Sequence, residues 1–245
     1  MITSTQNTQV KKWRKLHTRK ERMKTGLFLV EGFHLIEEAK KSNWKIKEII
    51  IRQGTEAPSR CEEQLMTVVS DVVFQHIAQT NTPQGIIAVI EMKKQTEFTG
   101  NQAMLIDRIQ DPGNLGTIIR TADAAGFSAV ILGKGTVDLF NDKVIRATQG
   151  SLFHIPIIQA DLLDKMKELT QDGFSIWATA LEGSKVYTEI AVPEKVALIV
   201  GNEGQGVTKD ILNIADFIVN IPIYGKAESL NVSIAAGILM YYLKG

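Results

Sequence analysis

Polar side chains suited to chemistry are concentrated at three glycine-containing loops, residues 111–116 (DPGNLG), 201–206 (GNEGQG) and 222–229 (PIYGKAES). Glycine tolerates positive φ angles and lets the main chain approach a ligand closely. Each loop follows a short apolar run, and open α/β sheets bind ligands beyond the carboxyl ends of their strands. The candidate polar residues in and beside these loops are Asn114, Arg120, Glu203, Ser229 and Asn231.

These loops differ from the common nucleotide-binding fingerprints. The chain lacks a G-x-x-x-x-G-K-[ST] segment, which disfavours a P-loop nucleotidase, and residues 201–206 are spaced G-x-x-G-x-G rather than G-x-G-x-x-G. That loop also lies late in the chain, whereas nicotinamide-binding and ordinary Rossmann-like methyltransferase domains carry their glycine loop after the first strand. Taken singly, each loop is as compatible with a tight structural turn as with a binding site.

The apolar pattern of residues 103–245 predicts an α/β domain that positions the three loops. Short apolar runs predict parallel strands covered on both faces, at 104–106, 129–132, 174–180, 196–200 and 217–221. Helical patterns lie between them, at 114–125, 143–149, 162–169 and 230–243.

Residues 1–95 predict a smaller α/β domain, joined to the second by a polar linker at 96–102. Val10, Trp13 and Leu16 fit one face of an N-terminal helix. Further helices are expected to open at Gly32 and to be capped by Ser70. The predicted strands lie at 27–30, 47–51 and 85–90.

Charge is distributed unevenly along the chain. Residues 1–26 hold eight Lys and Arg side chains against one acidic side chain, although the whole chain has a net charge of only +1. Such a segment indicates a polyanion partner, with the alternative that it is a solvated helix face. Trp13 and His17 either stack on bases or pack inward. The expected phosphate contacts are Lys11, Lys12, Arg14, Lys15 and Arg19.

Disulfide, metal and membrane functions are not indicated. The single cysteine, Cys61, cannot form an intrachain disulfide and favours a reducing compartment. The four histidines lack ligand spacing, so no metal site is expected. The start of the chain lacks a signal-peptide pattern, and the apolar stretch 232–243 is shorter than the roughly 20 residues of a membrane span. A soluble, cytoplasmic protein is expected.

The order of the motifs is more specific than any one loop. N-x-G-x-x-x-R at 114–120, GNEGQG at 201–206 and IPIYGKAESLNVSIAAG at 221–237 closely resemble the three motifs of the SpoU (TrmH) family of RNA ribose methyltransferases. The opening segments TQNTQVKKWRKL and FLVEGFHLIEEA resemble the substrate-binding domain of its ribosomal RNA members. The resemblance therefore covers the whole chain.

This resemblance implies a SPOUT domain with a deep trefoil knot, S-adenosylmethionine as methyl donor, and a homodimer. A knot departs from the general rule that chains do not thread loops, so only the motifs support it. The resemblance assigns cofactor binding to Gly201, Ile221 and Leu230. It assigns the polar active site to Asn114, Arg120, Glu203, Ser229 and Asn231.

The implied reaction places a ribose 2′-hydroxyl in line with a sulfonium methyl group. Arginine is a poor base because its very high pKa keeps the side chain protonated at neutral pH. We therefore expect Arg120 to contact the RNA phosphate and the developing alkoxide, and Glu203 to orient its guanidinium. Ser229 and Asn231 are expected to hold the ribose or to support the loop, with the alternative that Ser229 only caps the following helix.

Two classes of function are weighed. The first is a ribose 2′-O-methyltransferase acting on ribosomal RNA, with transfer RNA as the alternative substrate. The second is a non-catalytic RNA-binding protein such as a ribosome-assembly factor. The intact polar positions favour the enzyme. Asp107 and Asp111 are expected only to form a turn.

Overall fold

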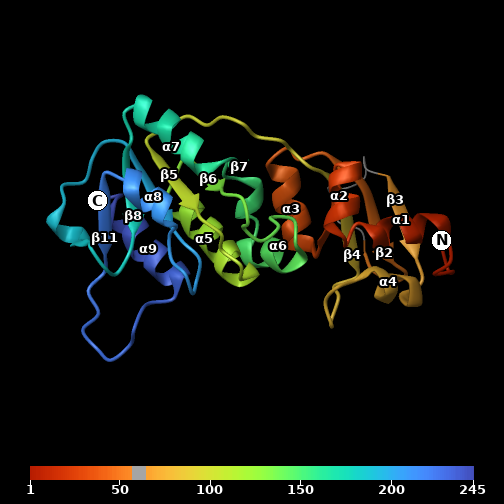
Figure 1. Cartoon of the computed structure of the whole chain (residues 1–245). Helices are drawn as coiled ribbons and strands as arrows, with labels where there is room; N and C mark the ends of the chain where they lie inside the picture. Colours follow the sequence, from red (N-terminus) through yellow and green to blue (C-terminus); the bar gives the residue numbers. More distant parts are fainter. Residues whose placement is uncertain (57–64) are drawn as a thin grey trace. The chain divides into compact units, whose positions relative to one another are not determined.

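The computed structural model describes residues 1–56 and 65–245, so Cys61 lies outside the described residues. Its contacts divide the chain into two compact units (Figure 1). Unit 1 comprises Met1–Lys93 and Asp138–Phe153, and unit 2 comprises Lys94–Val137 and His154–Gly245. No helix in the described part of the chain is long and apolar enough to cross a membrane.

Unit 1 is built on a four-stranded sheet with the order β1-β4-β2-β3. Strand β4 pairs antiparallel with β1 and β2, and β2 pairs parallel with β3. Its elements are α1 (Thr8–Lys15), α2 (Arg19–Thr25), β1 (Leu27–Glu31), α3 (Phe33–Lys41), β2 (Ile46–Arg52), β3 (Met66–Val69), α4 (Asp71–Ile77), β4 (Ile86–Glu91), α6 (Asp142–Thr148) and the 3-10 helix η1 (Ser151–Phe153). The predicted strands and helices of this region are confirmed.

The predicted apolar face of α1 is confirmed. Val10, Trp13 and Leu16 are buried in one core cluster with side chains of β2 and α4. Ser70 caps α4, as expected, by accepting a hydrogen bond from the N–H of Val73. Helix α2 was not predicted because its sequence RKERMKT holds one large apolar residue, Met23, which is exposed and leaves no periodic signal.

Residues 138–153 lie in the sequence range predicted for the second domain, but their contacts group them with unit 1. Arg22 forms an ion pair with Asp138, and the indole N–H of Trp44 donates to the carbonyl of Phe153 at 3.1 Å. Such long-range contacts leave no mark in local sequence pattern. The domain limits 1–95 and 103–245 remain a prediction.

Unit 2 is built on a seven-stranded sheet with the order β7-β6-β5-β10-β8-β11-β9, in which every pair is parallel. Its elements are β5 (Gln102–Ile106), α5 (Pro112–Ala124), β6 (Ala129–Leu132), β7 (Ile157–Gln159), α7 (Leu162–Gln171), β8 (Ser175–Thr179), β9 (Lys185–Val186), the 3-10 helix η2 (Tyr187–Glu189), β10 (Val196–Val200), α8 (Lys209–Ile214), β11 (Phe217–Asn220) and α9 (Val232–Tyr242). The expected parallel α/β domain is confirmed, while the knot remains a prediction.

The sheet of unit 2 is covered by helices, which explains its continuous apolar strands. All five residues of β10 are buried. Leu105 and Ile199 share a core cluster with Met166 of α7 and Ile211 of α8. Helices α5 and α9 contact each other, and α9 also contacts β10. The unpredicted elements β7, β9 and α8 are all short, from two to six residues.

Candidate functional site

The loops after β5 and β10 meet because these strands are parallel neighbours, with Ile106 opposite Val200. The side-chain amide of Asn202 donates to the carbonyl of Arg108 at 3.0 Å. The buried carboxylate of Asp107 accepts from the N–H of Thr208 at 2.8 Å, which ties β5 to the chain beyond the GNEGQG loop. Asp107 therefore connects the end of β5 to the segment after the GNEGQG loop, which is more than the turn role expected for it.

The GNEGQG loop is a tight turn closed by its own main chain. The N–H of Asn202 donates to Gly206 at 3.1 Å, and the N–H of Gly206 donates back at 2.9 Å. A Cβ atom on Gly201 would lie 2.2 Å from the carbonyl carbon of Gly206 and from the nitrogen of Val207. Glycine is required at 201 because the loop returns across it, leaving no room for a side chain.

The same loop also lines a pocket of about 460 Å³ in unit 2. All three residues expected to bind the cofactor, Gly201, Ile221 and Leu230, line this pocket. Residues 179–181, at the end of β8, form a further part of the wall that no sequence motif indicated. This segment lacks glycine and resembles any strand end, so only the fold reveals it.

A hydrogen-bonded network joins the three motifs beside this pocket. Glu203 Oε1 accepts from the N–H of Asp111 at 3.0 Å and from the side-chain amide of Asn114 at 3.1 Å. Its Oε2 accepts from the N–H of Gln110 at 3.1 Å. The side-chain amide of Asn231 donates to Asn114 Oδ1 at 3.0 Å. Three of the five predicted polar residues are thus brought together, and Glu203 and Asn231 also line the pocket.

Glu203 is held as an anion at the start of α5. Its partial burial raises its pKa, but the hydrogen bonds from Asp111, Asn114 and Gln110 outweigh that effect and leave the pKa below its ordinary value. The N-terminus of a helix also favours a negative charge. At neutral pH, Glu203 is therefore ionised and suited to positioning α5.

Helix α9 begins at Val232, and its N-cap is Asn231. The Oδ1 atom of Asn231 accepts from the N–H of Ser233 at 2.9 Å and from its hydroxyl at 2.6 Å. The alternative that Ser229 caps this helix is wrong, since Ser229 lies in the preceding loop and lines the pocket. Asparagine is a favoured N-cap residue, so this role was open to prediction.

Arg120 lies outside the network. Leu115, Ile118, Ile119 and Ala122 are fully buried on α5, as predicted. Arg120 is exposed and makes no hydrogen bond or ion pair with the residues that the structure describes. The expectation that Glu203 orients its guanidinium is wrong for this structure, because the carboxylate is engaged by Asp111, Asn114 and Gln110.

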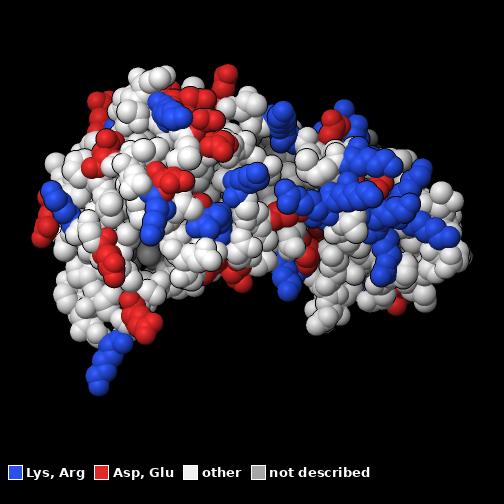
Figure 2. Space-filling model, viewed as in Figure 1, with Lys and Arg blue, Asp and Glu red and all other residues white. Residues whose placement is uncertain are grey.

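Unit 1 carries a basic face over α1 and α2 (Figure 2). Six of its cations are exposed and make no ion pair within the described chain: Lys11, Lys12, Lys15, Arg19, Lys20 and Lys24. Arg14 instead donates to the carbonyl of His76 at 2.6 Å. Arg22 is buried and donates to the carbonyls of Leu16 and His17, so it does not contribute to this face.

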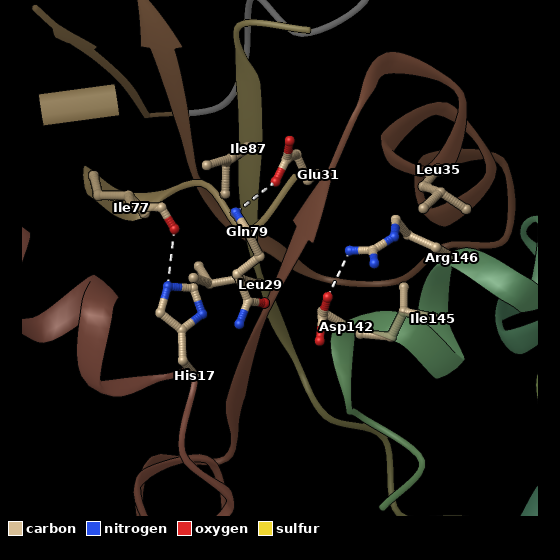
Figure 3. A pocket seen from close by; sticks show the side chains of 10 residues that line it. All are labelled: His17, Leu29, Glu31, Leu35, Ile77, Gln79, Ile87, Asp142, Ile145 and Arg146. Atoms are coloured by element: carbon tan, nitrogen blue, oxygen red, sulfur yellow. Dashed lines mark hydrogen bonds and ion pairs between the residues drawn. The ribbon is translucent and has the colours of Figure 1, made fainter. Parts of the chain in front are cut away.

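The two aromatic groups of the basic segment pack inward. Trp13 is 2% exposed, and its indole N–H donates to Glu48 at 2.9 Å. His17 borders a cavity of about 20 Å³, enough for roughly one water molecule (Figure 3). Its Nε2 donates to the carbonyl of Ile77 at 2.8 Å, and burial lowers its pKa. Neither ring is placed to stack on a base.

Comparison with known proteins identifies the two regions. Residues 101–241 match the SpoU rRNA Methylase family, and residues 7–88 match the MRM3-like substrate binding domain. The chain belongs to the SpoU rRNA methylase family. A relative 49% identical over 245 residues, 100% of this chain and 99% of its own length, is the 23S rRNA (guanosine(2553)-2′-O)-methyltransferase RlmP of Bacillus subtilis.

Solved structures of SpoU methylases and related enzymes share this fold. An AdoMet-bound rRNA methyltransferase from Sinorhizobium meliloti is 35% identical, with a TM-score of 0.90 over 99% of this chain and 96% of that one. AviRb from Streptomyces viridochromogenes, in complex with AdoMet, is 25% identical, with a TM-score of 0.89 over 98% and 97% of the two chains. This SpoU methylase is accordingly a methyltransferase that uses S-adenosylmethionine (AdoMet), as its motifs predict.

Proposed function

We propose that this SpoU methylase transfers a methyl group from AdoMet to a ribose 2′-hydroxyl of 23S ribosomal RNA. The observation that carries the proposal is the Glu203–Asn114–Asn231 network, which joins all three motifs at the edge of the pocket. The likeness to RlmP at 49% identity supports the substrate.

The pocket suits AdoMet in size and lining. Its volume of about 460 Å³ lies within the range of roughly 300 to 1,000 Å³ of small-molecule sites. Gly201 offers main-chain atoms with no side chain in the way, and Ile221 and Leu230 offer aliphatic contacts. When bound, AdoMet supplies an activated sulfonium methyl group.

The residues around the pocket then have separate tasks. Ser229 and Asn231, which line it, hold the ribose, while Glu203 and Asn114 fix the relative positions of α5 and the GNEGQG loop. Arg120 has no partner in the described chain, so it is free to bind the RNA phosphate and the developing alkoxide. Stabilising that charge is the contribution we assign to Arg120.

The basic face of unit 1 holds the RNA backbone. Four of the five predicted contacts, Lys11, Lys12, Lys15 and Arg19, are exposed and unpaired within the described chain. Arg14 is exposed but already bound to His76, so we expect a smaller contribution from it. In this proposal, residues 1–95 form the RNA-binding domain and residues 103–245 form the knotted methyltransferase domain.

We also propose that the enzyme is a homodimer through α9. Ile234, Ile238 and Tyr241 lie at helical spacing on this helix and are 54%, 37% and 56% exposed. An apolar stripe in water is the kind of surface that a second copy covers. A ribosomal RNA substrate supports a cytoplasmic location.

Mapping of 2′-O-methyl marks in RNA from cells with and without the protein tests this function. We expect one ribose mark in 23S ribosomal RNA to disappear when the gene is deleted and to return with the intact gene. Loss of a transfer RNA mark instead would support the alternative substrate. Unchanged marks in every RNA would support a non-catalytic binding protein and contradict the proposal.

A further inference from the structure

Tyr224 is 96% exposed, which is unusual for an aromatic side chain in this protein. Every aromatic residue of the chain lies in its described part, and the next most exposed rings are Tyr241 at 56% and Phe33 at 37%. Neither packing nor a hydrogen bond to a described residue accounts for the position of the Tyr224 ring. The exposure of this ring therefore indicates a binding partner outside the chain.

Tyr224 belongs to the loop that connects β11 to α9. This loop projects from the sheet of unit 2 (Figure 1). Ile223, immediately before Tyr224, lines the pocket, as do Ser229 and Leu230 at the other end of the loop. Tyr224 itself is not part of the pocket wall, but it follows a wall residue directly in the chain, so its loop begins and ends at the proposed cofactor site.

A cation accompanies this ring. Lys226 is exposed and makes no ion pair with any residue in the described part of the chain. An exposed ring stacks on any nucleobase, while a nearby lysine neutralises a backbone phosphate. Together, these two side chains have the chemistry of a site for single-stranded or unstacked RNA.

We propose that Tyr224 forms a nucleobase-stacking site for the RNA segment that carries the methylated ribose, with Lys226 on an adjacent phosphate. The inference rests on the proposed function. Methyl transfer to a 2′-hydroxyl requires the target nucleotide to be held in position beside the cofactor. A nucleotide that leaves the base stack of the RNA loses its stacking contacts, and stacking on a protein ring replaces them.

The basic face of unit 1 cannot supply this contact. Its aromatic groups, Trp13 and His17, are packed inside, and the exposed side chains on α1 and α2 are mostly cations. The basic face on α1 and α2 therefore offers phosphate contacts but no exposed ring for a base. Tyr224 supplies the missing base contact close to the chemistry.

The test compares Tyr224→Ala and Tyr224→Phe with the intact protein, using a 23S ribosomal RNA fragment that contains the target site. We expect Tyr224→Ala to raise the KM for RNA roughly tenfold or more, since a stacked base contributes affinity of this order. The affinity for AdoMet should stay unchanged. Tyr224→Phe keeps the ring and should stay within about twofold of the intact protein. Val192→Ala, at a position 43% exposed in unit 2, is the matched control for loss of surface apolar area.

A fluorescent base analogue gives an independent readout. With 2-aminopurine beside the target ribose, stacking should quench its fluorescence in the intact and Tyr224→Phe proteins and not in Tyr224→Ala. An unchanged KM and unchanged quenching in Tyr224→Ala would overturn the inference, as would weaker AdoMet binding alone or a changed oligomeric state alone. If the intact protein methylates no RNA, the proposed function fails; if it does and Tyr224→Ala behaves identically, only this inference fails.

Discussion

The basic face of unit 1 and the motif loops of unit 2 differ in whether their charged side chains have partners within the chain. On α1 and α2, six exposed cations make no ion pair with described residues. At the motif loops, the carboxylate of Glu203 is engaged by two main-chain N–H groups and one side-chain amide. The basic face leaves its cations unpaired, whereas the motif loops bind the Glu203 carboxylate with hydrogen bonds from the same chain.

This difference separates groups that act on an external molecule from groups that hold the protein in shape. Unpaired cations are retained where a polyanion binds, because their affinity comes from phosphate neutralisation. A carboxylate with three donors is committed to structure. By this criterion, Arg120 on α5 resembles the basic face of unit 1 rather than Glu203, whose carboxylate is bound at the start of the same helix.

The largest effect is expected at Gly201. Gly201→Val should abolish AdoMet binding and methyl transfer, because even a Cβ would lie 2.2 Å from the main chain of Gly206 and Val207. Calorimetry with AdoMet in the presence of EDTA measures the loss. Gly225→Ala is the control in another motif loop, at a glycine outside the pocket wall where no atom lies within 4 Å of a new Cβ. Binding by Gly201→Val, or loss of binding by Gly225→Ala, would contradict the requirement for glycine at 201.

The next largest effect is expected at Arg120. Arg120→Ala should keep the fold and AdoMet affinity but lower turnover by about 100- to 1000-fold, as loss of one oxyanion donor does in other enzymes. Arg120→Lys should recover little, since a point charge cannot replace the planar guanidinium. Single-turnover kinetics separate this loss from weaker binding. Near-normal turnover by Arg120→Ala would place Arg120 among the solvated surface charges.

A moderate effect is expected on the basic face. Neutralising Lys11, Lys12, Lys15 and Arg19 together should weaken RNA binding and flatten its salt dependence, by at most about 0.7 to 0.9 in slope for each lost phosphate contact. Titrations at several salt concentrations give the slope. Lys165 and Lys167, already paired with Glu168 and Asp164, are the control positions. An unchanged slope in the variant would mean that α1 and α2 present only a solvated face.

The smallest effect is the pH dependence of stability at Glu203. Its pKa is lower in the folded protein than its ordinary value of 4.5, so the ionised group stabilises the fold fully above that value. This stabilisation should be lost as the pH falls through the lower, folded-state pKa. Urea unfolding at pH 6 and below pH 4.5 gives the difference in free energy of unfolding between the intact protein and Glu203→Gln. This difference should become smaller in acid. The effect is small because Glu203 is exposed and water screens its interactions. A difference in free energy of unfolding that grows in acid would contradict a stabilising role for the hydrogen bonds to Glu203.

Local sequence pattern predicted the parts of the fold that depend on local periodicity. The buried strand Val196–Val200 and the buried stripe of α5 were both predicted and confirmed. Helix α2 was missed because charged residues give no amphipathic signal, and β7 and β9 because two or three residues are too few to show one.

The sequence predicted which residues belong to the site but not which of them contact one another. The motifs identified Asn114, Glu203 and Asn231, whereas the partners of each depend on which loops the parallel strands bring together. Glu203 was expected to bind the opposite charge on Arg120. It binds main-chain N–H groups instead, because the start of α5 presents unsatisfied donors directly at the loop. Such donors are present at every helix start and leave no sequence signal of their own.

Methyl transfer to a matched pair of RNA substrates tests most directly whether the enzyme modifies a ribose 2′-hydroxyl. One is a 23S ribosomal RNA fragment with the intact target nucleotide, and the other differs only by a 2′-deoxy sugar at that position. We expect both RNAs to bind with similar affinity, the intact RNA to accept one methyl group from AdoMet, and the deoxy RNA to accept none. Methylation of the deoxy RNA would move the chemistry from ribose to base and contradict ribose methylation.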